Sequence, residues 1–341
     1  MALISILSFR LGASDGVSIE SAKWISALRH LGHDVRTIAG EGVCDVVIEG
    51  LAIGATSPPT LGELRVAVGE SELVIVENLA SLPLNIGARE VVYELLHERR
   101  AILHHHDLSW QRSHLAHLEG PRDEPLWRHV TINDLSRREL LERGIDAVTI
   151  MNSFDCDPPR GNRDRARPAE CATNERLVLL PTRAIERKNV RGALDLCAAL
   201  NASLWILGPS EDGYEPELDR LLRATKVTTF RGLAPESSIH DAYAACDLVV
   251  MPSTWEGFGN PVLESVTHRR PLALNPYPVA REITAFGFSF FNLADVHAIE
   301  QFLEHPSDEL FDANLAIARK FFNLRDLPQR LAPLLESVQI H

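Results

Sequence analysis

The chain has 341 residues, of which 45% are hydrophobic, so it can bury large cores, and its length predicts about two domains. Its formal net charge of −13 argues against nucleic acid as a partner, because binding a phosphate backbone needs concentrated Lys and Arg. Its five cysteines lie far apart without a CxxC pair, which is typical of reduced thiols and argues against a zinc or disulfide scaffold.

The first residues do not resemble a targeting signal. Met1 leads directly into the strand-like LISILSF, with no basic segment and no cleavage site. No apolar run reaches ~18 residues, the length that a membrane-spanning helix needs. We therefore expect a cytoplasmic protein that does not span a membrane.

Strand-like and helix-like segments alternate through the first half of the chain. Residues 16–32 (GVSIESAKWISALRHLG) place apolar side chains at steps of three and four, which predicts a helix. Ser14 or Asp15 would cap this helix, with Glu20 in its first turn. Strands that are apolar on both faces are typical of parallel sheets covered by helices, so we expect an α/β fold. The predicted strands are 3–9, 72–77, 101–106, 129–132 and 147–151.

A polar stretch separates this half from a second one with the same alternation. Residues 156–174 are rich in Pro and Arg and lack an apolar period, so we predict a linker at 161–175. The chain should then form two doubly wound domains, at 1–160 and 176–323. The strands predicted in the second half are 176–182, 203–208, 227–230, 247–253 and 271–275.

The segment WEGFGNPVLE (255–264) follows one of these strands, at the edge where open parallel sheets bind ligands. Asn260 is a good N-cap and Pro261 suits the first helical position, so a helix should begin near residue 261. Gly257 and Gly259 let the backbone approach a ligand closely. The free N–H groups of the helix favour an anion there, most naturally a phosphate.

Two glutamates flank this predicted phosphate-binding position. Glu256 emerges on the loop after the strand, and Glu264 lies about one turn into the helix. A carboxylate accepts hydrogen bonds from paired sugar hydroxyls, so this arrangement predicts a ligand made of a sugar, a diphosphate and a ribose. Arg183 and Lys188, in TRAIERKN, follow another strand at the same sheet edge and could neutralise the diphosphate.

These residues resemble retaining glycosyltransferases of family 4, which have the GT-B fold with two Rossmann-like domains facing across a cleft. The matching pattern is Arg183-x4-Lys188, then ILG, then FRGLAPESSIHDAYAACDLVVMPSTWEGFGNPVLE (230–264), which contains the Glu-x7-Glu of the family. Looser matches lie in the first half, at 14–35, 104–107 and 131–155.

The resemblance implies a role for each matching residue. Glu256 contacts hydroxyls of the donor sugar and Glu264 holds the ribose, while Arg183 and Lys188 hold the diphosphate. His106 reaches the donor sugar from the first domain, and Glu256, Arg183, Lys188 and His106 form the expected catalytic set. In the first loop, SDGV lacks the paired glycines usual in the family. The other implied donor contacts are Gly16, Arg231, Gly232, Leu233, Gly257, Phe258, Gly259 and Asn260.

The C-terminal segment 309–338 is expected to form two helices broken near Asn323. By the resemblance, the last helix, at about 324–341, crosses back to the first domain.

Three consecutive histidines, His104 to His106, leave several interpretations open. They could bind a metal, pack or cap, or contact a sugar through His106. Neighbouring strand residues face opposite sides, so all three cannot converge on one ion. We predict no metal site and no cofactor.

Other function classes compete with glycosyl transfer. A nicotinamide oxidoreductase is disfavoured, because the first turn lacks GxGxxG. A GT-B epimerase or hydrolase, a phosphorylase and a non-catalytic sugar-nucleotide binder remain alternatives, although nothing marks the pyridoxal lysine that a phosphorylase needs.

The expected reaction moves a hexosyl group, mannose or glucose, with retention of configuration and without a metal. The nucleotide is GDP or UDP, and double displacement and front-face attack both stay open. The first helical stretch has too few basic residues for membrane binding. We therefore expect a small soluble acceptor, possibly anionic, with Arg10, Lys23, Asp107 and Arg112 as candidate contacts.

Overall fold

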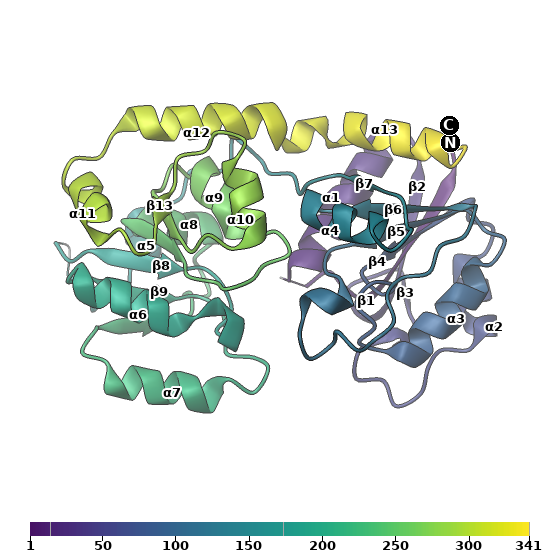
Figure 1. Ribbon diagram of the computed structural model, residues 1–341, viewed down its shortest axis with the longest axis horizontal. Helices are drawn as coiled ribbons and strands as arrows, with labels where there is room; N and C mark the ends of the chain where they lie inside the picture. Colours follow the sequence, from purple (N-terminus) through teal and green to yellow (C-terminus); the bar gives the residue numbers. More distant parts are fainter. Residues whose placement is uncertain (14, 173, 341) are drawn as a thin grey trace. The chain divides into compact units, whose positions relative to one another are not determined.

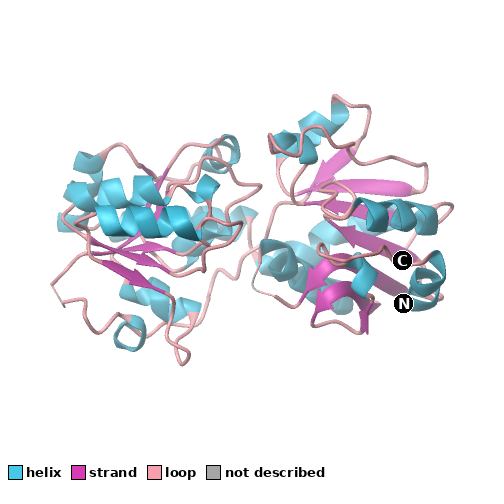
Figure 2. Cartoon of the chain, turned by 90° about the horizontal axis from the view of Figure 1, so that it is seen from below, coloured by secondary structure: helices cyan, strands magenta, loops and turns pink. Residues whose placement is uncertain are grey.

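The computed structural model describes residues 1–13, 15–172 and 174–340, so the cap predicted at Ser14 lies outside the described residues. The chain divides into two compact units. The first is Met1–Ser153 together with Leu324–His341, and the second is Phe154–Asn323. Each unit has a parallel sheet between helices, as Figures 1 and 2 show.

The first unit contains a seven-stranded sheet in the order β3-β2-β1-β4-β5-β6-β7, and all of its strand pairs are parallel. Its strands are β1 (Leu3–Leu11), β2 (Asp34–Gly42), β3 (Val46–Val47), β4 (Leu73–Glu77), β5 (Ala101–His105), β6 (Trp127–Thr131) and β7 (Ala147–Thr149). Its helices are α1 (Gly16–His30), α2 (Leu61–Val68), α3 (Ile86–Leu96), α4 (Asp134–Leu141) and α13 (Leu327–Ser337), with short turns η1 (Glu49–Leu51), η2 (Ser109–Gln111) and η4 (Leu324–Asp326).

Strand β2 was not predicted from the sequence. Its sequence, DVRTIAGEG, is polar at both ends, and only its middle four residues are buried. The apolar run is therefore too short to stand out. Parallel pairing with β1 over most of its length supplies the strand conformation that the pattern did not indicate.

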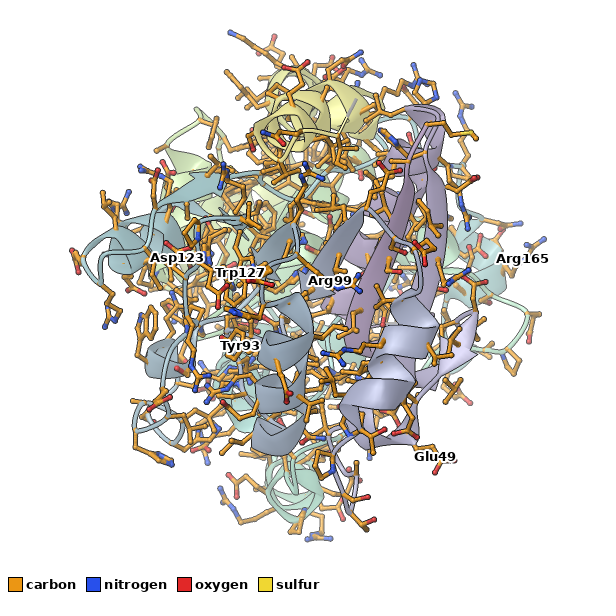
Figure 3. The ribbon with its side chains drawn as sticks, turned by 90° about the vertical axis from the view of Figure 1, so that its right-hand side faces the viewer. Glu49, Tyr93, Arg99, Asp123, Trp127 and Arg165 are labelled. Atoms are coloured by element: carbon orange, nitrogen blue, oxygen red, sulfur yellow. The ribbon has the colours of Figure 1, made fainter. Side chains whose placement is uncertain are left out.

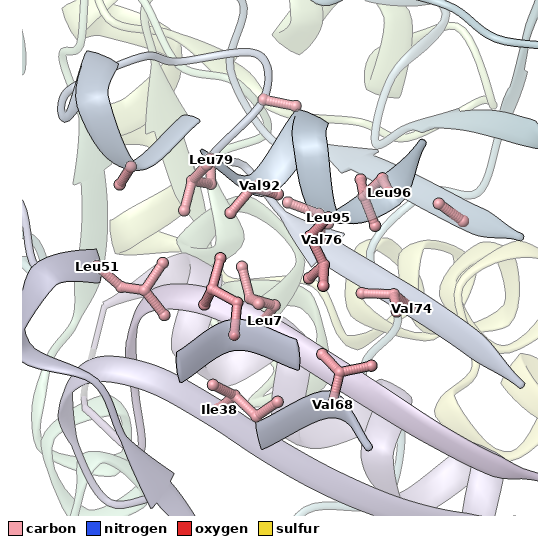
Figure 4. Close-up of a cluster of buried hydrophobic side chains, with 14 of the residues drawn as sticks. Leu7, Ile38, Leu51, Val68, Val74, Val76, Leu79, Val92, Leu95 and Leu96 are labelled. Carbon is pink, nitrogen blue, oxygen red and sulfur yellow. The ribbon is translucent and has the colours of Figure 1, made fainter. Parts of the chain in front are cut away.

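Apolar side chains cover both faces of this sheet. On one face, Leu7 and Val76 pack with residues of α2 and α3 (Figure 4). Tyr93 of α3 stacks on Trp127 of β6 with ring centroids 5.6 Å apart, and Figure 3 labels both. The other face is covered by α1 and by α13, whose Leu331 joins the same buried cluster. The C-terminal helix is thus part of the first unit.

The second unit contains a six-stranded parallel sheet in the order β10-β9-β8-β11-β12-β13. Its strands are β8 (Leu177–Leu180), β9 (Ser203–Ile206), β10 (Thr229–Arg231), β11 (Leu248–Met251), β12 (Leu272–Leu274) and β13 (Phe291–Asn292). Its helices are α5 (Arg163–Ala166), α6 (Val190–Ala199), α7 (Glu215–Ala224), α8 (Ile239–Ala245), α9 (Asn260–Thr267), α10 (Pro278–Thr284), α11 (Val296–Glu304) and α12 (Asp308–Phe321), with the turn η3 (Glu186–Lys188).

The described residues of the stretch predicted as a linker, 161–172 and 174–175, belong to the second unit. The stretch contains the short helix α5, which packs against α8. Gly161 is so close to α8 that a Cβ there would lie 1.9 Å from the His240 carbonyl oxygen. The chain passes between the units at 153–154 and again at 323–324 instead. Among the described residues, every helix is too short or too polar to cross a bilayer.

Candidate active site

Glu256 lies in the loop that follows β11, at the carboxyl edge of the second sheet, and its side chain is buried. Both carboxylate oxygens are paired with cations. Lys188 Nζ donates to Oε1 at 2.5 Å, and Arg187 donates to Oε2 at 2.6 Å. Burial raises the pKa of Glu256, but the charges of Lys188 and Arg187 outweigh it and lower the pKa to about 2. Glu256 is therefore a buried anion at neutral pH.

The structure brings Lys188 to Glu256, as its place at the same sheet edge suggested, but adds a cation that the sequence analysis missed. Lys188 is buried, and burial together with the charge of Arg187 lowers its pKa, against the opposing pull of Glu256. Arg187 also donates to the Trp255 carbonyl oxygen at 3.0 Å. The turn η3 directs both neighbouring cations toward one carboxylate. Only the position next to Lys188 in the sequence could have pointed to Arg187.

Helix α9 begins one residue earlier than predicted. Gly259 is its N-cap, Asn260 is its first residue, and Pro261 follows, so the prediction of Asn260 as the cap is wrong. The cap has φ near 90°, which favours glycine. A Cβ at Gly259 would also lie 2.3 Å from the Tyr277 hydroxyl oxygen. Glycine is thus required here by conformation and by space.

The loop before α9 is fixed by aromatic side chains. The Tyr277 hydroxyl donates to the Phe258 carbonyl oxygen at 3.0 Å. The Phe258 ring is buried and stacks on Phe154 with centroids 5.9 Å apart. Phe258 therefore anchors the loop through its side chain, which leaves its backbone and that of Gly257 as the parts near α9.

Glu264 lies in the second turn of α9, where the buried Tyr243 of α8 donates a hydrogen bond to its Oε2 at 2.7 Å. Burial and the charge of Glu264 raise the pKa of Tyr243 well above its ordinary value, so the phenol stays a donor. Tyr243 also stacks on His268, with centroids 4.4 Å apart. Neither residue was singled out from the sequence.

The other predicted donor contacts lie around β8, β9 and β10. Arg183 pairs with Glu211 at 2.5 Å instead of with Glu256. Arg231 pairs with Glu215 at 2.9 Å and is exposed, as is Gly232, whose carbonyl oxygen accepts from Trp205 Nε1 at 2.8 Å. Leu233 is half-buried. Their partners hold these residues at the edge of the second sheet, but Arg183 does not join the cluster at Glu256.

In the first unit, His106 directly follows β5 and is buried. Its Nε2 lies 2.7 Å from Oε2 of Glu77, the last residue of β4, and His104 Nδ1 lies 2.9 Å from the same oxygen. Burial raises the pKa of Glu77, but the two imidazoles outweigh it and lower the pKa to about 2. Burial lowers the pKa of His106, but the hydrogen bond and charge of Glu77 raise it above its ordinary value.

His105 faces the other side of the sheet. Its Nε2 lies 2.9 Å from His129 Nδ1, and His129 Nε2 lies 3.1 Å from an Asp123 carboxylate oxygen. Figure 3 labels Asp123 near Trp127, at the start of β6. The alternation expected of strand residues therefore separates His105 from His104 and His106.

A metal could be considered at Glu77, His104 and His106, because one ligand atom of each lies within 4.8 Å of the others. However, the imidazole nitrogens lie 2.7 and 2.9 Å from a single carboxylate oxygen. These distances suit hydrogen bonds and ion pairs and are shorter than the spacing of ligands around a tetrahedral zinc ion.

The predicted acceptor contacts are all paired in the first unit. Arg10 donates to Asp15 at 3.2 Å, and Arg112 donates to Asp107 at 2.8 Å. Lys23 pairs with the buried Glu20 and donates to the Ser153 carbonyl oxygen at 2.6 Å. The structure thus gives these cations internal partners and does not gather them into one anion site.

The start of α1 follows the prediction for Asp15 but not for Glu20. Asp15 caps the helix by accepting from the backbone N–H groups of Val17 and Ser18. Glu20 lies beyond the first turn, which contains no acidic residue, and it is buried and paired with Lys23. Gly16 is the first residue of α1, and a Cβ there would meet nothing within 4 Å, so its space does not demand glycine.

Comparisons with known proteins show what this chain is similar to. Residues 176–304 match the model described as glycosyl transferases group 1. The chain is 26% identical to mannosylglucosylglycerate synthase of Thermotoga maritima, over 96% of this chain and 98% of the relative.

Solved structures share its fold. The sucrose-phosphate synthase of Thermosynechococcus elongatus matches with a TM-score of 0.73 at 14% identity, over 99% of both chains. The Anabaena protein HepE, crystallised with UDP and glucose, matches with a TM-score of 0.67 at 16% identity, over 99% of this chain and 100% of HepE.

Proposed function

We propose that this chain, which has the GT-B fold, is a group 1 glycosyltransferase that moves a hexosyl group from a nucleoside-diphosphate sugar to a small soluble acceptor. The observation that carries the proposal is the cluster at Glu256. A buried carboxylate, two cations and the start of α9 lie together at the carboxyl edge of one sheet.

The donor would occupy this edge of the second unit. Lys188, Arg187 and the N–H groups at the start of α9 would bind the diphosphate, because all of them favour an anion. Glu256 would exchange a cation partner for hydroxyls of the sugar. Glu264, oriented by Tyr243, would accept from the ribose hydroxyls. Arg183 would have to leave Glu211 to reach the phosphates.

The transfer breaks the bond between the anomeric carbon and the diphosphate oxygen, and the electron pair leaves with the diphosphate. The cations of the cluster stabilise that developing charge without a metal. The oxygen of an acceptor hydroxyl forms the new bond and gives up its proton, which the departing diphosphate takes, and the configuration of the sugar is retained. His106 would contact the donor sugar.

The similarity to a mannosylglucosylglycerate synthase supports a mannosyl donor over a glucosyl one, and an acceptor that carries a glycerate carboxylate. HepE was crystallised with UDP, which supports a nucleoside diphosphate in this fold without choosing between UDP and GDP. Arg10 and Arg112 are partly exposed cations of the first unit that such a carboxylate could recruit, in competition with Asp15 and Asp107.

Release of nucleoside diphosphate tests the proposal. The enzyme is incubated with GDP-mannose, UDP-glucose and related donors, with and without soluble acceptors such as glycerate and glucosylglycerate. Release that needs an acceptor supports transfer. Release without any acceptor indicates a hydrolase or epimerase, and binding without release indicates a non-catalytic protein. Transfer only to lipid acceptors, together with tight binding to anionic liposomes, would contradict the soluble acceptor.

A further inference from the structure

Glu77, His104 and His106 form a buried polar cluster at the carboxyl ends of β4 and β5. Glu77 is fully buried, and His104 and His106 are almost so. Both imidazoles contact Glu77 Oε2, while Oε1 has no hydrogen-bond partner among the described residues. A buried carboxylate without a charged partner is costly, so the anion at Glu77 depends on these rings.

The two rings differ in what holds them. His104 is stacked on Trp24, with centroids 4.1 Å apart, and burial lowers its pKa. His106 makes the shorter contact to Glu77, and its backbone N–H donates to Asn78 Oδ1 at 3.1 Å. No hydrogen bond of His106 Nδ1 occurs among the described residues. With Nε2 directed at Glu77, Nδ1 is the ring atom left for a ligand.

We propose that Glu77 is a positioning residue for transfer, whose buried carboxylate fixes the His106 ring, keeps a proton on its Nε2 and favours its charged form. The proposal rests on the proposed function, in which His106 contacts the donor sugar. A charged ring held this way presents an Nδ1–H donor to a sugar oxygen, whereas a neutral ring with the proton on Nε2 presents only an acceptor.

Other charges also face His106 and must be counted. From α1, Glu20 is buried and paired with Lys23. After β5, Asp107 is paired with Arg112. Glu20 and Asp107 each favour the charged ring, but their own partners offset part of that effect. Glu77 is the only carboxylate that contacts the His106 ring among the described residues, so its removal should change the ring most.

Glu77→Gln tests the proposal, with Asp123→Asn as the matched control. The control removes a carboxylate from a buried histidine, His129, on the opposite face of the same sheet. NMR of labelled imidazoles follows the titration of His106, which is assigned by the signal lost in His106→Gln. Glu77→Gln should lower the pKa of His106 by about one unit or more, because an opposite charge at this distance shifts a pKa by that amount. Asp123→Asn should leave it unchanged.

Kinetics supply the second readout. In Glu77→Gln, the pH at which kcat/KM for the donor falls on the alkaline side should decrease by the same amount as the pKa of His106. The reason is that the pH profile of kcat/KM reports the ionisations of the free enzyme. The loss should reach about tenfold above both pKa values and shrink toward acid pH. Glu77→Asp, which keeps a carboxylate, should restore part of both effects. Asp123→Asn should keep the wild-type profile.

Each failure has a distinct signature. If His106 keeps its pKa in a folded Glu77→Gln, the proposal is overturned. If that pKa moves but the kcat/KM profile does not, the part of Glu77 in transfer is overturned. A wild-type enzyme that releases no nucleotide with any donor refutes the proposed function before a variant is made. Should Glu77→Gln not fold, wild-type NMR still decides, because a His106 pKa below about 6.5, the ordinary value for a histidine, would contradict the proposal.

Discussion

Two buried carboxylates occupy matching places in the two units. Strand β4 lies between β1 and β5 in the first sheet, and β11 lies between β8 and β12 in the second. In each sheet the strand order reverses at this point, and β4 and β11 are the strands just beyond the reversal. Glu77 ends β4, and Glu256 follows β11. Both carboxylates are buried anions with pKa values lowered to about 2.

Their partners differ. Glu256 is paired with the cations Lys188 and Arg187, whereas Glu77 contacts two imidazoles. Glu77 raises the pKa of His106 and favours its charged form, but an imidazole can lose that charge as the pH rises. The second unit therefore holds its carboxylate with a charge that pH does not change, as a diphosphate site needs. The first unit holds its carboxylate with a charge that pH can remove.

The largest effect is expected from the permanent cations. Lys188→Ala should reduce turnover by roughly two to four orders of magnitude, because it removes charge stabilisation from the leaving diphosphate. Arg183→Ala should have a similar effect if Arg183 turns from Glu211 to the donor, and Glu256→Ala should also abolish most transfer. Steady-state kinetics measure the losses, with Arg191→Ala, an exposed cation on α6, as the control. Wild-type rates in a folded Arg183→Ala, Lys188→Ala double variant would contradict the assignment.

A smaller loss is expected at the cation that only the structure revealed. Arg187→Ala should lower kcat roughly ten- to hundredfold, the value of one charge-assisted hydrogen bond, because Lys188 still pairs with Glu256. Arg220→Ala, which removes an exposed partner of Glu217, serves as the control. If Arg187→Ala matched Lys188→Ala in severity, the two cations would have to act as one unit.

Of the two cations at Glu256, Lys188 was predicted from the sequence and Arg187 was not. Lys188 and Glu256 were found because each follows a buried strand, and the ends of parallel strands meet at one edge. Arg187 was missed because its direction depends on the turn η3, which no apolar period reveals. Arg183 was expected beside Lys188, but a local pair with Glu211 holds it elsewhere.

Glu77 was missed for a different reason. It is the last residue of an apolar strand, and its partners lie 27 and 29 residues further along the chain. Their contact follows from the pairing of β4 with β5, in which Glu77 lies opposite His104. Strands and their order could be predicted from apolar runs, whereas the register that joins these polar groups is a property of the folded sheet.

The two carboxylates should also respond differently when stability is measured against pH. The raised pKa of His106 means that its pairing with Glu77 stabilises the fold fully below about pH 6.5 and less as pH rises through the folded value. The lowered pKa of Glu256 means that its pairing is complete above about pH 4.5 and is lost only toward pH 2. Between pH 5.5 and 8, only the contribution of the Glu77–His106 pair to the stability of the fold should change.

Thermal unfolding of Glu77→Gln and Glu256→Gln across that range measures the difference. The deficit of Glu77→Gln relative to wild type should shrink with rising pH, by about 1.4 kcal/mol for each unit by which the substitution lowers the pKa of His106 in the folded protein. The deficit of Glu256→Gln should stay constant. Parallel curves for the two variants would mean that Glu77 and His106 are not a titrating pair.

The smallest effect is expected from chelation. Transfer should continue after dialysis against EDTA, because Lys188 and Arg187 supply the positive charge that a divalent ion would bring to a diphosphate. No Asp-x-Asp follows a strand in the second half of the sequence to hold such an ion. The hydrogen-bond spacing at Glu77, His104 and His106 gives the same expectation for the first unit. Turnover before and after dialysis, with metal content measured in parallel, checks the prediction. Loss of nearly all activity in EDTA, restored by magnesium or manganese, would place a metal where the protein's own cations are assigned.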